Sequence, residues 1–345
     1  MQDSSTVAWQ CPSNIALVKY WGKHGRQLPR NPSISLTLDN AHTKMYVTYN
    51  YSQTPLDSLK LSFLFDGKEQ SAFKEKIHRF LLSIADDFPL INHLELHIES
   101  TNSFPHSSGI ASSASSMSAL AMCLLDIEKE ILNKEHLDIN KASHLARLGS
   151  GSASRSVHPY IAIWGKHKDI FASSDEYAIP YYERLHPVFQ TFHDDILIIS
   201  DREKAVSSRA GHALMENNPY APARFNEANM NLMDIIEAME KGDLEVFGNI
   251  LESEALTLHA LMMSSKPPYI LMEPNSLAGI KMIQEFRSST RTPVYFTLDA
   301  GPNIHLLYPH EYLTQVNQLK SDLRSLCHEG RIIEDQVGKG PLKIL

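Results

Sequence analysis

Hydrophobic and polar residues alternate in several short stretches of the first hundred positions. The clearest stretches cover residues 45–49, 59–65 and 94–98. A period of two places every second side chain on one face, so each stretch predicts a half-buried strand. Between the last two, apolar residues recur at helical spacing and predict a helix over 69–85 that ends before Pro89.

The remainder of the chain has a more helical pattern. Helices are predicted from about residue 114 to 125 and over 134–148, 223–241, 243–263, 276–288 and 311–327, and strands over 195–200, 294–298, 304–308 and 331–334. Gly242 is the expected end of one helix, because glycine tolerates the left-handed conformation found there. The predicted order is strands, then a mixed region, then mainly helices. This order indicates an α+β fold.

Length and composition narrow the class of protein. A chain of 345 residues predicts two domains, which we place at 1–190 and 191–345. Three widely spaced cysteines are typical of a reducing compartment, and no apolar run reaches the roughly 20 residues of a membrane span, so a soluble cytoplasmic protein without a membrane partner is expected. The net charge of −8 disfavours nucleic acid as the partner.

Two loops rich in small residues are candidates for binding an anion. The segment 104–113 (FPHSSGIASS) enters a helix, and there Gly109, the serine hydroxyls and the helix N-terminus together would suit a phosphate. The segment 149–155 (GSGSASR) adds the guanidinium of Arg155. Each loop alone could be a linker or a surface turn, but the two together favour a polyanionic ligand.

Two charged residues stand in unusual places. Lys19 interrupts the apolar run of segment 14–23 (NIALVKYWGK), where a lysine needs a partner or a ligand unless it reaches solvent at a sheet edge. Asp299 lies between a strand and a Gly-Pro turn, either as a turn residue or as a carboxylate directed at a cleft. The 17 histidines are scattered without a zinc-binding motif, so no metal-ligating residue is predicted.

Five segments together resemble one family, in its chain order. They are 14–23, 104–114 (FPHSSGIASSA), 149–155, 206–211 (VSSRAG) and 296–303 (FTLDAGPN). Segment 104–114 is similar to the phosphate loop of the GHMP kinase superfamily. The other four resemble the diphosphomevalonate decarboxylase family within it, and the likeness extends over nearly the whole chain.

The resemblance implies a fold and a reaction. The fold would be that of the GHMP kinases, with a ribosomal-protein-S5-like N-terminal lobe, a ferredoxin-like C-terminal lobe and the active site between them. The reaction would convert mevalonate 5-diphosphate and ATP into isopentenyl diphosphate, ADP, phosphate and carbon dioxide through phosphorylation of the 3-hydroxyl. This is a step of isoprenoid synthesis by the mevalonate pathway. Mg²⁺ as cofactor and a homodimer are also implied.

The resemblance also assigns roles to single residues. The catalytic set would be Asp299, Lys19 and Arg155. The substrate-binding set would be Tyr20, Lys23, Ser150, Ser152 and Arg209. The ATP-binding set would be Ser108, Gly109, Ser112, Ser113 and Ser208.

Related activities are the alternatives. A phosphomevalonate decarboxylase would use the monophosphate, and a mevalonate 3-kinase would stop after phosphorylation. A catalytically silent paralogue is expected to have lost Asp299 or Arg155, and this chain has both. The chain departs from the family at 106–108, at 157–160 and at His212, beside the binding loops, which bears on the substrate more than on the reaction type.

Overall fold

The computed structural model describes residues 4–104, 112–202, 206 and 208–345, with only the backbone of Ser208 and Arg209. Its elements are β1 (Ser5–Val18), β2 (Lys23–His24), β3 (Leu28–Pro29), β4 (Ser33–Tyr51), β5 (Lys60–Phe65), β6 (Lys68–Glu69), α1 (Ser71–Ser83), β7 (Leu94–Asn102), α2 (Ser112–Ile131), α3 (Ile139–Gly149), β8 (Ile161–Trp164), β9 (Ala178–Pro180), β10 (Phe192–Leu197), α4 (Ser208–Ala213), α5 (Ala221–Lys241), α6 (Leu244–Met263), α7 (Pro274–Thr290), β11 (Tyr295–Thr297), β12 (Ile304–Pro309), α8 (Leu313–Leu323), β13 (Ile332–Ile333) and β14 (Leu342–Lys343), with short 3₁₀ helices between some of them. The predicted α+β class is confirmed.

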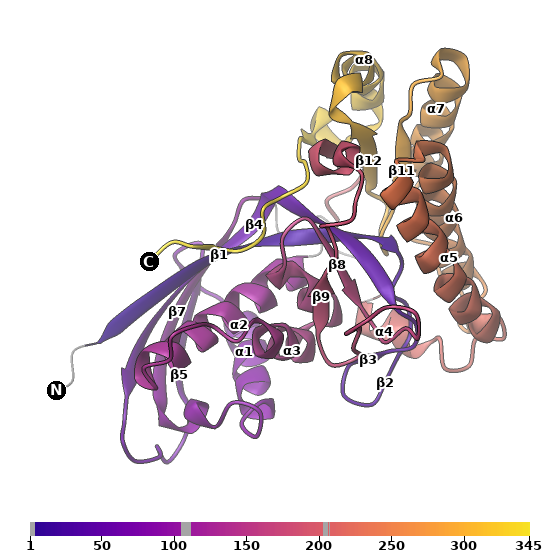
Figure 1. Cartoon of the computed structure of the whole chain (residues 1–345). Helices are drawn as coiled ribbons and strands as arrows, with labels where there is room; N and C mark the ends of the chain where they lie inside the picture. Colours follow the sequence, from indigo (N-terminus) through magenta and orange to yellow (C-terminus); the bar gives the residue numbers. More distant parts are fainter. Residues whose placement is uncertain (1–3, 105–111, 203–205, 207) are drawn as a thin grey trace.

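The N-terminal lobe is a sheet with helices on one face. The strand order is β14-β1-β4-β7-β5-β6, and β8 and β9 extend the sheet from β4. Helices α1, α2 and α3 cover one face (Figure 1). Alternate residues of β7, among them Leu94, Leu96 and Ile98, enter the core under these helices, as their period of two predicts.

The C-terminal lobe is a smaller antiparallel sheet with the order β11-β12-β10-β13. The helices α5 to α8 lie beside this sheet, and the long strands β1 and β4 separate them from α1–α3 (Figure 1). Its core includes Phe296, Ile304 and Leu306 from the strands and Ile283 and Val316 from the helices. Gly242 ends α5 with φ of 75°, as predicted.

Strand β1 joins the cores of the two lobes. Its register with β4 is interrupted between Pro12 and Asn14 and again between Ala16 and Val18. Residues before the first break belong to the core under α1–α3, whereas Ile15 and Leu17 belong to a second core shared with α5 and α6. The strand therefore ends, at Val18, where the lobes meet.

Some boundaries differ from the predictions. The predicted strand over 45–49 is the end of a much longer strand, β4, whose first six residues are all buried even though Ser or Thr alternates with Ile or Leu there. The helix predicted over 134–148 begins at Ile139, because the Asp138 side chain accepts a hydrogen bond from Lys141 N and caps it. The segment 149–155, expected as a loop, is the end of α3 followed by a 3₁₀ helix over Gly151–Val157.

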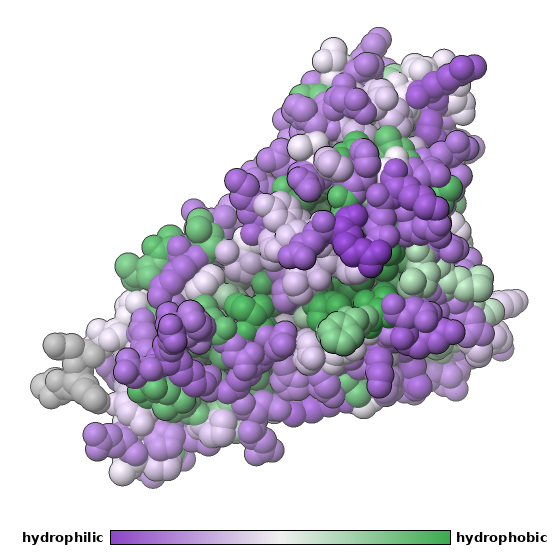
Figure 2. Space-filling model, in the orientation of Figure 1, coloured by the Kyte–Doolittle hydropathy of each residue, from purple (hydrophilic) through white to green (hydrophobic). Residues whose placement is uncertain are grey.

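The described helices include none that is long and apolar enough to cross a membrane. Hydrophobic residues reach the surface in separate patches (Figure 2), one of them where the C-terminus lies in Figure 1. The exposed apolar residues of that terminal segment are Leu342, Ile344 and Leu345.

Gly248 permits close packing of α6 on β11 and gives a first prediction. A Cβ at this position would collide with the ring of buried Tyr295. Gly248→Ala should therefore lower the free energy of unfolding by about 1–3 kcal/mol, despite the better helix propensity of alanine. Urea denaturation measures the change. Ser253→Ala, at an exposed position of the same helix, is the control, and equal stability of the two variants would contradict the packing argument.

Buried His158 gives a second prediction, on the pH dependence of stability. Its Nε2–H donates to Ala178 O at 2.9 Å, and burial lowers its pKa from 6.5 to about 4. The unfolded chain thus binds a proton that the folded chain excludes, and stability is full above pH 6.5 and falls as the pH drops toward 4. Between pH 7.5 and 5 this histidine should remove about 2 kcal/mol.

His158→Gln keeps an N–H donor but does not titrate. Between pH 7.5 and 5 the variant should lose about 2 kcal/mol less unfolding free energy than the wild type loses. Urea denaturation at both pH values measures the two losses. If they are equal, His158 is not the group that binds the proton.

Candidate functional site

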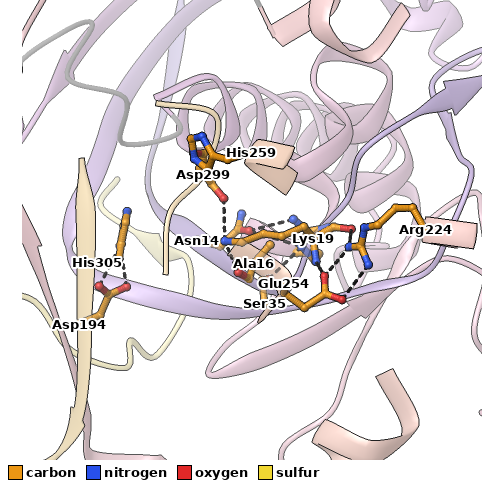
Figure 3. Close-up of polar contacts among 11 residues, drawn as sticks. Asn14, Ala16, Lys19, Ser35, Asp194, Arg224, Glu254, His259, Asp299 and His305 are labelled. Atoms are coloured by element: carbon orange, nitrogen blue, oxygen red, sulfur yellow. Dashed lines mark hydrogen bonds and ion pairs between the residues drawn. The ribbon is translucent and has the colours of Figure 1, made fainter. Parts of the chain in front are cut away.

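A partly buried ion pair joins two segments that the sequence singled out. Lys19 follows the last residue of β1, and its Nζ lies 3.1 Å from Asp299 Oδ1, in the turn after β11 (Figure 3). The Lys19 side chain is 1% exposed and that of Asp299 is 32% exposed, so the carboxylate is the member that a ligand can reach. The structure therefore brings together two predicted catalytic residues 280 positions apart.

The surroundings of Lys19 control its charge. Its ammonium also donates to Ala16 O at 2.7 Å. Burial lowers the pKa of Lys19, and the negative charge of Asp299 opposes that shift. Lys19 is thus no snorkelling lysine at a sheet edge. Asp299, for its part, accepts Gly301 N–H at 2.7 Å through its carbonyl, which is the turn role, while its side chain pairs with the ammonium.

Arg155, the third predicted catalytic residue, is a buried cation with neutral partners. Its guanidinium donates to Ser33 Oγ at 2.6 Å, to Ser35 Oγ at 2.9 Å and to Asn14 Oδ1 at 3.3 Å. Burial lowers its pKa to about 10, opposed by the charge of Asp299, so it stays charged at neutral pH. In the described part of the chain no carboxylate lies within ion-pair distance of it, so an anionic ligand would complete its environment.

Aromatic rings pack against Tyr20, one of the predicted substrate-binding residues. Tyr20 packs edge-on against Trp164, with ring centroids 4.7 Å apart, and lies against the backbone of Gly151. His212, one of the departures from the family, lies against Tyr20 and Trp21 at centroid distances of 4.5 and 4.4 Å.

The imidazole of His212 has a structural role. Its Nδ1 accepts Gly22 N–H at 3.0 Å, and burial together with the charge of Lys23 lowers its pKa to about 3. The ring is therefore neutral at physiological pH. Lys23, on β2, donates to Gln27 Oε1 at 2.7 Å.

The two small-residue loops meet. Ser113, in the first turn of α2, and Ser150, at the end of α3, lie with their hydroxyl oxygens 3.1 Å apart. Ser152 is half-buried in the following 3₁₀ helix, where its carbonyl accepts Asn14 Nδ2–H at 3.1 Å. A helix N-terminus and several hydroxyls thus face one region, which suits a phosphate group.

A pocket with an aromatic wall adjoins the start of α2. Its lining includes Phe63, Phe65, Phe73 and Lys76 together with Ser112 and Ser113. A flat apolar group could lie against the aromatic side while a charged group reaches the helix N-terminus. No sequence pattern pointed to this pocket.

The remaining predicted binding residues are described in part or not at all. Ser108 and Gly109 lie outside the described residues. Ser208 and Arg209 begin α4, with only their backbone described.

Sequence reasoning missed three buried polar residues around the ion pair. Glu254 and His259 lie on α6, and Arg224 lies on α5; all three are less than 10% exposed. A signal was present for two of them. Glu254 falls on the apolar stripe that continues through Leu251 and Leu258, and Arg224 falls four residues before Ala228 on the stripe of its own helix.

Comparison with known proteins gives two family matches. Residues 11–178 match the diphosphomevalonate decarboxylase-like N-terminal domain. Residues 195–341 match the mevalonate 5-diphosphate decarboxylase C-terminal domain.

Single relatives agree with these matches. The chain is 31% identical to diphosphomevalonate decarboxylase of Ganoderma lucidum, over 89% of this chain and 79% of the relative. It superposes with a TM-score of 0.85 on mevalonate diphosphate decarboxylase of Staphylococcus aureus, at 29% identity over 100% of this chain and 99% of that one. A structure described as MDDEF in complex with MVAPP, AMPPCP and magnesium gives a TM-score of 0.82 at 28% identity, over 99% of both chains. The chain therefore belongs to the diphosphomevalonate decarboxylase family and has its two-lobed GHMP kinase fold.

Proposed function

We propose that this enzyme catalyses the ATP-dependent decarboxylation of mevalonate 5-diphosphate to isopentenyl diphosphate. The observation that carries the proposal is the pair of buried Lys19 and the more exposed Asp299, with the cation of Arg155 nearby. A carboxylate held beside an ammonium suits deprotonation of a hydroxyl, and a second buried cation suits an acidic substrate. Family membership supports the reaction type.

The first half of the reaction is a phosphoryl transfer. Asp299 orients the tertiary 3-hydroxyl of the substrate and accepts its proton while the hydroxyl oxygen attacks the γ-phosphorus of ATP. The bond from the γ-phosphorus to the leaving oxygen breaks, and ADP departs with that electron pair. Lys19 keeps Asp299 ionised before the transfer and offsets the negative charge that develops during it.

The second half removes two groups. The bond between C3 and the phosphate oxygen breaks, and phosphate leaves with the electron pair. The bond between C2 and the carboxyl carbon then breaks, its electrons form the new double bond, and carbon dioxide departs. Arg155 holds the carboxylate in the orientation that aligns this bond, since its planar guanidinium is positioned by Ser33, Ser35 and Asn14.

We assign the nucleotide to the region around the start of α2. The pocket with the aromatic wall suits the base, and Ser112, Ser113, Ser108, Gly109 and Ser208 are the proposed contacts of the phosphates. Mg²⁺ usually retains waters and binds through phosphates with few protein groups. This fits the described residues, which hold no group of three or more histidine, cysteine, aspartate or glutamate side chains able to bind a metal. When bound, Mg²⁺ neutralises charge on the ATP phosphates; AMPPCP and magnesium in the MDDEF complex support this assignment.

The diphosphate is assigned to the neighbouring hydroxyls and cations. Tyr20, Lys23, Ser150, Ser152 and Arg209 are the proposed contacts. The packing of Tyr20 between Trp164 and His212 supports its place in this set, because it restricts the ring to one orientation.

Assembly, location and domain division stay proposals that rest on the sequence. We propose a cytoplasmic homodimer whose two domains are 1–190 and 191–345.

A substrate assay tests the function. Purified protein receives mevalonate, its 5-phosphate or its 5-diphosphate, each with Mg-ATP, and both ADP and carbon dioxide are measured. We expect equal amounts of ADP and carbon dioxide, with the highest kcat/KM on the diphosphate. Faster turnover of the monophosphate would assign the alternative decarboxylase, and ADP without carbon dioxide would assign a 3-kinase.

Asp299→Ala tests the mechanism. Loss of the proton acceptor should reduce kcat by about 10²–10⁴-fold, the usual contribution of a general base, with little change in the Kd of ATP. Steady-state kinetics and calorimetric titration with a non-hydrolysable ATP analogue measure these quantities. A kcat near that of the wild type would remove Asp299 from the reaction.

A further inference from the structure

Helix α6 contacts both members of the Lys19–Asp299 pair through side chains to which the proposed reaction gives no role. Glu254 contacts Lys19, and His259 contacts Asp299 (Figure 3). Both side chains are almost fully buried, Glu254 at 0% and His259 at 2% exposed. Two residues five positions apart on one helix therefore contact the two halves of the ion pair.

Glu254 binds the backbone of Lys19. Its Oε2 accepts the N–H of Lys19 at 2.8 Å. Lys19 lies one residue beyond β1, and its backbone is buried, so its polar groups need partners from elsewhere in the fold. The carboxylate of Glu254 thus replaces a strand partner at the point where the chain leaves the sheet.

Arg224, on the neighbouring helix α5, binds both Glu254 and the backbone of Lys19. Its Nη1 donates to Glu254 Oε1 at 2.8 Å, and its Nη2 donates both to Glu254 Oε2 and, at 3.3 Å, to Lys19 O. Asn31 Nδ2 also donates to Lys19 O, at 3.0 Å. Both backbone groups of Lys19 are therefore bonded to this arrangement, in which the charge of Glu254 is balanced by Arg224.

His259 holds the other half of the pair. Its Nε2 lies 3.1 Å from Asp299 O. A carbonyl oxygen only accepts, so this nitrogen carries a hydrogen and donates it. The bond fixes the backbone from which the Asp299 carboxylate projects toward Lys19.

We propose that Glu254 and His259 are positioning residues for the reaction, and that helix α6 sets the separation of the Lys19 ammonium from the Asp299 carboxylate. The inference rests on the proposed function for the roles of Lys19 and Asp299. Because α6 contacts both backbones, loss of either contact lets one reacting group move relative to the other. A displacement of about 1 Å is enough to cost on the order of 10²-fold in rate.

The same helix offers a matched control. Glu252, two residues before Glu254, is also buried and also forms a two-pronged ion pair, with Arg287 Nη1 at 2.6 Å and Nη2 at 2.9 Å. It also accepts Phe296 N–H at 3.3 Å, so it belongs to the packing of α6 on β11; among the contacts of the described residues it has none with Lys19 or Asp299. Loss of either pair removes a buried bidentate bond, but only Glu254 touches the reacting pair.

The test compares Glu254→Gln with Glu252→Gln in steady-state ADP formation by the full-length enzyme. Glu254→Gln should lower kcat by about 10²-fold while KM for both substrates stays within about threefold. Glu252→Gln should lower the Tm to a similar extent but keep kcat within about threefold of the wild type. Equal loss of kcat in the two variants, or no loss in Glu254→Gln, would overturn the proposal.

A second pair of variants tests the other contact and decides the matter should Glu254→Gln fail to fold. His259→Gln keeps an N–H donor of similar reach, whereas His259→Leu leaves Asp299 O without this bond. We expect kcat to fall about tenfold or more in the leucine variant and to return close to the wild-type value in the glutamine variant. A leucine variant as active as the wild type would overturn the proposal.

The readout separates this proposal from the proposed function. The ion pair serves phosphoryl transfer, so ADP formation reports on its geometry even if no carbon dioxide is released. An active wild type with no effect at Glu254 or His259 would overturn the positioning role alone. A wild type without turnover of any of the three substrates would overturn the proposed function and, with it, this inference.

Discussion

An ammonium group withdrawn from water is stable only where the fold supplies fixed partners for it, and the ammonium of Lys19 is such a group. The strand that carries it ends where the two lobes meet, so its partners come from both. Ala16 O belongs to its own strand, whereas Asp299 belongs to the C-terminal lobe, and Glu254 of that lobe accepts the backbone N–H of the same lysine. The relative position of the lobes is thus part of the electrostatics of the site.

The second buried cation, Arg155, has partners of a different kind. Arg155 is surrounded by hydroxyl and amide oxygens from Ser33, Ser35 and Asn14, which orient the guanidinium without neutralising it. A carboxylate partner within the protein would compete with an anionic ligand, and neutral partners avoid this. Lys19, in contrast, is paired with a carboxylate of the protein, and its partner Asp299 is the more exposed group. In the proposed reaction one cation activates a carboxylate, while the other is available for an acidic ligand.

Sequence patterns could predict the parts of this architecture that depend on local periodicity. Strand β7, helices α5 and α6 and the end at Gly242 follow from alternation, helical spacing and a glycine. The first six residues of β4 were missed although Ser or Thr alternates with Ile or Leu along them; all six are buried, which a period of two does not predict. Lys19 and Asp299 stood out as charges in unusual places. Their contact could not be predicted, because they are 280 positions apart and a local pattern says nothing about pairs so distant in the sequence. Glu254 received no role from the sequence, although it stands in the apolar stripe of its helix.

The pairing of the terminal strands has a consequence for how the molecule assembles. Strand β14 closes the edge of the first sheet by pairing Trp9 with Lys343 and Gln10 with Leu342. Until residues beyond 340 are available, β1 therefore presents an unpaired edge, which is the kind of surface on which chains aggregate. During synthesis the N-terminal sheet would stay open at this edge while the C-terminal lobe is made. Because this pairing joins residues far apart in the sequence, we expect the chain to fold slowly.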